Sequence, residues 1–147
     1  MNSKYEAFDR SYLLLKPLSE RIDDMNLDYL LPLEGPALDF VHPQLKQVVK
    51  RIVAAKGKGS ARIIMMRAHV IKKGVSRYFV DLLERSHFTH IAMNGAGAIH
   101  DYELARAGAT TESVARCIRS SEFGLRREAG ELNEVIRGAA APSLGLG

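Results

Sequence analysis

The fold is decided by ARIIMM (residues 61–66) and THIAMN (residues 89–94), two short and nearly continuous apolar runs. Their length favours buried strands, and the first run follows a glycine-rich break. The runs start 28 residues apart, with the helical pattern of residues 75–85 between them. This spacing is typical of a β-α-β unit, so we expect two adjacent parallel strands with a right-handed crossover.

Helical patterns fill much of the chain around these runs. A helix is expected from His42-Pro43, where proline suits the first turn, to the glycines at 57 and 59. One face of this helix should carry the apolar residues that recur at three- and four-residue spacing: Leu45, Val48, Val49, Ile52 and Val53. Further helices are expected at residues 99–107, 111–120 and 126–137.

The first part of the chain, residues 1–41, is expected to be an extended N-terminal arm. Prolines at 17, 32 and 36 interrupt every periodic stretch there, which leaves at most a short helix near residues 19–25. Residues 42–147 are then expected to form one α/β domain.

Composition excludes several classes of protein. The 147 residues suit one domain, and 46% hydrophobic with 26% charged residues excludes collagen-like and low-complexity chains. No apolar run approaches the ~20 residues of a membrane helix, and the first ten residues lack the apolar core of a secretory signal, so no membrane is expected. The single cysteine, Cys117, is expected to be a buried small hydrophobe in a reducing cytoplasm.

Charge is distributed unevenly. Residues 1–43 carry eight acids and four bases, whereas residues 44–80 carry ten bases and no acid. Such a block can bind a polyanion, yet no aromatic residue interleaves the bases before Tyr78, so nucleic acid is not the expected partner. A smaller anion such as a cofactor pyrophosphate needs only a few of these charges.

Polar residues and glycines follow both expected strands, at RAHVIKKG (67–74) and NGAGAIHD (94–101). Ligands of open parallel sheets bind beyond the carboxyl ends of the strands. Gly95 and Gly97 would let backbone N–H groups approach a phosphate, particularly if a helix starts at Ala98. A tight turn is the alternative explanation of these glycines. His100 and Asp101 lack a third ligand at metal-binding spacing, so no metal is expected.

Five motifs run through and beyond these strand ends: AHVIKKG (68–74), FVDLLER (79–85), THIAMNGAGAIHDYE (89–103), GATTESVAR (108–116) and EFGL (122–125). Together they resemble the bacterial branch of the deoxyhypusine synthase family, from about Leu18 onward. The resemblance implies a Rossmann-like, doubly wound parallel sheet that binds NAD, of which residues 42–147 would be a partial, N-terminal half. It also implies a homo-oligomer, usually a homotetramer.

The activity that the resemblance implies is transfer of an aminobutyl group from spermidine to a protein lysine. NAD takes a hydride from spermidine, an enzyme lysine carries the imine, and the hydride returns; bacterial relatives act on spermidine or related amines. By position, the resemblance implies that the cofactor is lined by Ala68, His69, Val70, Ile71, Lys72, Gly95, Ala96, Gly97 and Asp101. His100 and Asp101 fall on the family's paired acids and would bind the amine substrate.

This chain departs from the family at several positions. A histidine at 100 weakens the attraction for a polycation, Arg67 replaces a glycine, and Arg126 replaces a tryptophan. Arg67 would either crowd the cofactor or reach its phosphate. The family's catalytic lysine has no counterpart in these residues, so no catalytic residue is assigned. The expected function is that of an N-terminal fragment of an NAD-dependent transferase. The alternatives are a non-catalytic module that binds NAD or a partner, and a polyanion-binding protein that uses residues 46–77.

Overall fold

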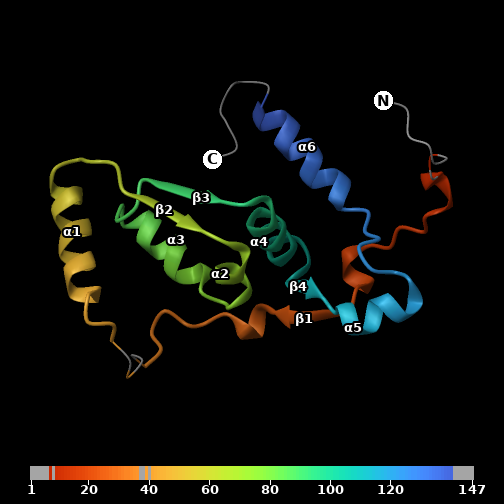
Figure 1. Cartoon of the computed structure of the whole chain (residues 1–147), viewed down its shortest axis with the longest axis horizontal. Coiled ribbons are helices and arrows are strands. Elements are labelled where there is room, and N and C mark those ends of the chain that lie inside the picture. The colour runs from red at the N-terminus through yellow and green to blue at the C-terminus, as the bar shows by residue number, and fades with distance from the viewer. Residues whose placement is uncertain (1–6, 8, 37–38, 40, 141–147) are drawn as a thin grey trace.

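The structure is a computed structural model that describes residues 7, 9–36, 39 and 41–140. It is a mixed α/β fold (Figure 1) with the elements β1 (Asp23–Asn26), α1 (Leu45–Gly57), β2 (Ile63–Met66), α2 (Ala68–Lys72), α3 (Ser76–Glu84), β3 (His90–Met93), α4 (Gly95–Ala107), β4 (Ala109–Glu112), α5 (Val114–Cys117) and α6 (Ala129–Ala140). Short 3-10 turns lie at Arg10–Tyr12, Leu18–Glu20, Leu27–Tyr29 and Ile118–Ser120.

The predicted β-α-β unit is confirmed. Strands β2 and β3 pair in parallel, with Ile63 opposite His90 and Met66 opposite Met93, and helices α2 and α3 lie between them in the chain. The described residues form two separate two-stranded sheets, β2-β3 and β1-β4, and no larger doubly wound sheet is present among them. No helix in these ranges is long and apolar enough to cross a membrane.

The expected short helix near residues 19–25 is wrong in part, because only a 3-10 turn at Leu18–Glu20 forms and β1 follows it. β1 pairs antiparallel with β4, so that Met25 lies opposite Thr110. The helix predicted over residues 111–120 therefore begins only at Val114. The described part of the expected arm is thus paired with a distant segment, which local periodicity does not reveal.

The core lies where α2, α4 and β1 meet. Met25, Ile71 and Leu104 form its buried cluster, with Leu30 and Met66 packed against them. The C-terminal end of α4 is closed by Gly108, whose φ of 71° is readily adopted only by glycine. Helix α6 begins at Ala129, three residues later than expected, because Arg126 forms a β-bridge with Lys16.

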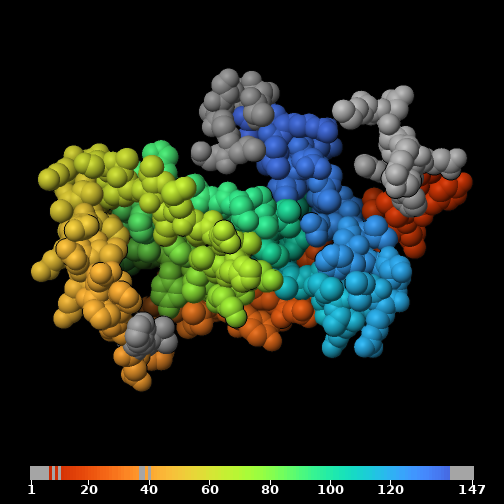
Figure 2. Space-filling view, in the orientation of Figure 1, coloured from red at the N-terminus to blue at the C-terminus, as the bar shows by residue number. Residues whose placement is uncertain are grey.

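Helix α1 stands apart from this core at one end of the molecule (Figures 1 and 2). It ends at Gly57, as predicted. Four of the residues expected to share its apolar face are each about half exposed: Leu45, Val48, Val49 and Val53. Ile52, on the same face, is half-buried and lines a shallow hollow with Ile63 and Ile64 of β2. The apolar spacing of α1 predicts an amphipathic helix, but it does not specify which neighbour would bury the apolar face.

Candidate functional site

The two segments that follow β2 and β3 meet at one edge of the parallel sheet. Arg67 is the N-cap of α2 and Asn94 is the N-cap of α4, so each helix starts within one residue of its strand. Helices α2 and α4 pack against each other (Figure 1). Residues 68–72 and 95–97, which are far apart in the sequence, are therefore brought together.

The N-terminus of α4 is already capped. The Gly97 N–H donates to the Asn94 carbonyl oxygen at 2.8 Å and to Asn94 Oδ1 at 3.2 Å. The helix consequently starts at Gly95 and not at Ala98, as the phosphate-binding hypothesis assumed. A Cβ at Gly97 would lie 3.0 Å from Met93 Sδ, whereas one at Gly95 would meet nothing within 4 Å. The absence of a side chain at Gly97 thus makes room for Met93. At Gly95 it leaves open space at the start of α4.

The five expected site residues of α2 differ in exposure. Ala68 and Ile71 are buried, Val70 and Lys72 are half-buried, and His69 is exposed. Ile71 belongs to the core, so the side chains of Ala68 and Ile71 fill the interior. Of the five, Lys72 lines the cavity described below.

His100 and Asp101 do not lie side by side, because successive helical residues point about 100° apart. His100 turns inward, with Nδ1 2.6 Å from Thr110 Oγ1. Asp101 is exposed and lines a different hollow, next to Ile91 and Ala98 on the β3 side of α4. The two residues expected to bind the amine together therefore face separate surfaces.

Glu103 is the centre of a buried ionic network. Arg21 Nη1 and Nη2 donate to its two carboxylate oxygens at 2.8 and 2.9 Å, and Arg126 Nη1 lies 3.0 Å from Oε1. Thr110 Oγ1 donates to Oε2 at 2.6 Å. Arg21 also pairs with Asp23 at 2.7 Å. The side chains of Arg21 and Glu103 are only 7% and 3% exposed, so the network is shielded from water.

The network shifts the protonation of its members. Burial raises the pKa of Glu103, but hydrogen bonds from Arg21 and Thr110 outweigh it and hold that pKa below its ordinary value. Burial raises the pKa of Asp23, and Arg21 only partly offsets this. Burial lowers the pKa of His100, the neighbouring Glu103 opposes this, and the charge of Lys72 adds to it. Glu103 is therefore ionised at neutral pH, and His100 is held neutral.

A cavity of about 300 Å³ opens beside this network, between α2, α4 and the segment after β4. Its polar lining comprises Arg21, Lys72, His100, Glu103, Thr111, Glu112 and Arg126, and its apolar lining Ala96, Ile99, Val114 and Phe123. Three residues expected at the site, Lys72, Ala96 and His100, are thus brought together here. We call this cavity the Lys72 groove.

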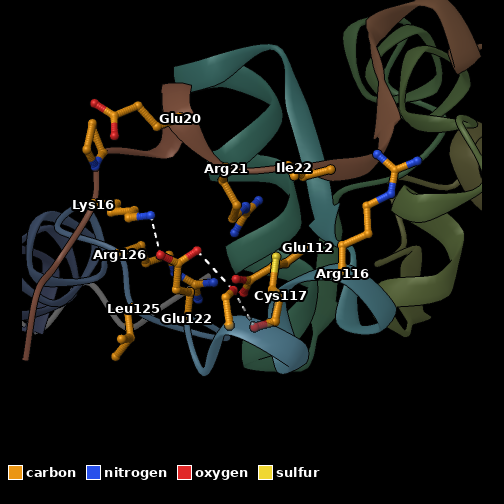
Figure 3. Close-up of a pocket in the computed structure, with 12 residues that line it drawn as sticks. Lys16, Glu20, Arg21, Ile22, Glu112, Arg116, Cys117, Glu122, Leu125 and Arg126 are labelled. Atoms are coloured by element: carbon orange, nitrogen blue, oxygen red, sulfur yellow. Dashed lines mark hydrogen bonds and ion pairs between the residues drawn. The ribbon is translucent and has the colours of Figure 1, made fainter.

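A second cavity of about 200 Å³ lies beyond Arg21, Glu112 and Arg126, which line both (Figure 3). Lys16 and Glu122 form an ion pair at its rim. Cys117 is buried there, as expected, and burial together with Glu112 raises the pKa of its thiol. A thiol of this kind is a weak nucleophile. Within the described ranges, no three His, Cys, Asp or Glu side chains gather as a metal site would require.

Sequence reasoning missed Arg21 and Glu103 as partners. Glu103 stands in the quoted THIAMNGAGAIHDYE motif, three residues after His100 and thus on the same side of the helix. That spacing was an available signal. Arg21 lies 82 residues before Glu103 and had none. The sequence marks Arg126 only as a departure from the family. Its contact with Glu103 shows that it is a member of the buried ionic network.

The fold and the site define a mixed α/β protein with a β-α-β unit and a charged groove at its strand ends. No family model matches the chain, and neither the curated proteins nor the solved structures include a match.

Proposed function

We propose that this chain contributes the NAD-binding edge of a deoxyhypusine synthase-like transferase that acts on an amine. The observation that carries the proposal is the meeting of residues 68–72 and 95–97 at the carboxyl ends of two parallel strands. Cofactors of parallel α/β folds bind at this edge. The sequence motifs of these two segments are the reason for proposing the deoxyhypusine synthase family in particular.

The residues at this edge suit a dinucleotide in two respects. The space around Gly95 allows a phosphate to approach the start of α4, where the helix dipole favours an anion. Arg67, exposed at the end of β2, offers a cation for the same phosphate. When bound, NAD would supply hydride transfer; the residues named here would bind and orient it.

A non-catalytic module that binds NAD is the second candidate, and the exposure of the lysines favours it. Lys72 is half-buried and Lys73 is exposed, so water reaches both. A lysine that carries an imine needs a desolvated pocket. We expect that the chain incubated with spermidine and NAD gives no NADH and no borohydride-trapped adduct. An adduct at Lys72 or Lys73 would instead make these residues catalytic.

Thermal unfolding with and without NAD tests the proposal. A ligand that binds the folded state at 100 times its Kd adds about 2.7 kcal/mol of stability, so NAD should raise the Tm by several degrees. Gly95→Leu should abolish this rise because its side chain fills the space at the start of α4. Gly130→Leu is the matched control, since a Cβ there also meets nothing within 4 Å but lies in α6.

Circular dichroism should show that both leucine variants retain the helix content of the original chain. The proposal fails if NAD leaves the Tm of the original chain unchanged. It also fails if Gly95→Leu binds NAD as tightly as Gly130→Leu does.

A further inference from the structure

The donors and acceptors of the Lys72 groove are unequally used. Both oxygens of Glu103 are occupied, Oε1 by Arg21 and Arg126 and Oε2 by Arg21 and Thr110. A carboxylate oxygen has two lone pairs, so Glu103 has little capacity left to accept from an amine. The carboxylate of Glu103, the strongest acceptor of the groove, is therefore occupied by hydrogen bonds within the protein.

Two hydrogen-bond donors of the groove, in contrast, are not used by the described residues. Arg21 Nε and Thr111 Oγ1 are buried, and neither has a hydrogen-bond partner among the described residues. Both residues line the groove, and the Arg21 side chain is more than nine-tenths buried. Leaving such groups without partners is costly, and a bound acceptor would relieve that cost. Lys72 adds a primary ammonium to the same wall.

The formal charges in and directly behind the lining of the Lys72 groove balance. The lining carries three cations, Arg21, Lys72 and Arg126, and two carboxylates, Glu103 and Glu112. The third carboxylate is that of Asp23, which lies behind the lining and pairs with Arg21 at 2.7 Å. Because these charges balance, the surroundings suit a ligand that itself carries both a carboxylate and an ammonium. Glu112 Oε2 accepts from the Gly124 N–H at 2.9 Å, and the carboxylate of Glu112 is less fully occupied than that of Glu103.

We infer that the Lys72 groove binds a small amino carboxylate, whose carboxylate contacts Lys72 and the spare donors of Arg21 and Thr111. The ammonium of the same molecule lies toward Glu112. The volume of about 300 Å³ is at the lower end for ligand pockets and suits a molecule of the size of an amino acid. This inference deepens the proposed function, on which it rests for the view that the amine is a reactant.

Ornithine and putrescine are the matched probes, because putrescine is ornithine without its carboxylate. Calorimetric titration of the 147-residue chain, without NAD, should give measurable binding of ornithine and at least tenfold weaker binding of putrescine. Lys72→Met should weaken ornithine binding about tenfold, as expected for loss of a charge-assisted hydrogen bond. Thr111→Val, which removes an unpartnered hydroxyl, should weaken it by a smaller factor.

Lys73→Met is the control, since Lys73 is exposed and does not line the groove. Putrescine binding as tightly as ornithine would overturn the inference, and so would ornithine binding that Lys72→Met leaves unchanged. Absence of ornithine binding in a chain whose Tm still responds to NAD would overturn this inference alone. Ornithine binding without any response to NAD would leave the groove assigned and the proposed function wrong.

Discussion

At the scale of single residues, the network around Glu103 links segments that are far apart in the chain. Arg21 comes from the N-terminal arm, Thr110 from β4 and Arg126 from the segment before α6. Burying these charges is costly, and the cost is offset only while every partner is present. The network therefore makes the fold sensitive to the loss of any one member.

Glu103→Gln should destabilise the protein strongly, because it leaves Arg21 and Arg126 buried near a neutral amide. Breaking a buried pair in this way typically costs about 3–5 kcal/mol. The free energy of unfolding in urea measures the effect. Glu131→Gln is the control, since Glu131 pairs with Arg106 at the surface and should cost no more than about 1 kcal/mol. Equal losses in the two variants would contradict this account of the network.

The pKa of His100 gives a pH dependence with a definite sign. Burial lowers this pKa below the ordinary 6.5, so the folded state favours neutral His100. The resulting stability is fully present above pH 6.5 and is lost as pH falls toward the lower folded-state pKa. The lowered pKa of Glu103 acts in the same sense, but only below pH 4.5. The raised pKa of Asp23 acts in the opposite sense.

Urea midpoints at pH 7.5 and 5.5 isolate the contribution of His100, because the carboxylates of the network titrate mainly at lower pH. The original chain should lose stability between these two values. His100→Gln should lose less over the same interval, since glutamine does not titrate. An identical pH dependence in the two proteins would rule out His100 as its source.

At the scale of elements, Gly74 fixes the close approach of the N-terminal arm to the turn after α2. Its φ is 76°, and the Leu31 N–H donates to its carbonyl oxygen at 2.8 Å. A Cβ at this position would lie 2.1 Å from the Tyr29 carbonyl oxygen. The backbone of the arm thus occupies the space that any other residue would need.

Gly74→Ala should consequently cost about 3 kcal/mol or more, since it combines an unfavourable φ with a backbone clash. Gly59→Ala is the matched control. Gly59 has a similar φ of 67° but nothing within 4 Å of its Cβ position, so the cost there should be only about 1–2 kcal/mol. Denaturant unfolding of both variants measures the difference. Similar losses of stability in the two variants would mean that the backbone of the arm moves easily to make room for the added methyl group.

At the scale of the whole molecule, apolar surface gathers around α1 and β2. Met65 is 82% exposed and Ile63 59%, close in the chain to the half-exposed apolar face of α1. β2 and β3 each have a single strand partner among the described elements, which leaves one edge of each open. Unpaired edges and apolar patches favour association. The expectation of a homo-oligomer, which follows from the family resemblance, is compatible with this surface.

Met65→Lys should reduce any self-association while leaving the fold intact. An exposed side chain contributes little to folding, so the free energy of unfolding should change by no more than about 0.5 kcal/mol. Light scattering with size-exclusion chromatography over a range of concentrations measures the mass. Ser60→Lys, at an exposed polar position near the same strand, is the control for added charge. A fall in mass with the control as well would point to charge and not to the apolar patch.

Features of this protein that depend on neighbours in the chain could be predicted from the sequence. The two strands, the helices α1, α3 and α4 and the parallel pairing all follow from local periodicity and from the spacing of two apolar runs. The same patterns placed Lys72, Ala96 and His100 at one edge of the sheet.

Features that depend on distant partners became visible only in the folded chain. No window of sequence shows that Met25 pairs with Thr110, or that Arg21 reaches Glu103 across 82 residues. The contact of Arg21 with Glu103 forms because burying a charge requires an opposite charge, wherever in the chain it stands. That requirement consumed the oxygens of Glu103 and left the Lys72 groove with unused donors, whereas the geometry of α4 separated His100 from Asp101.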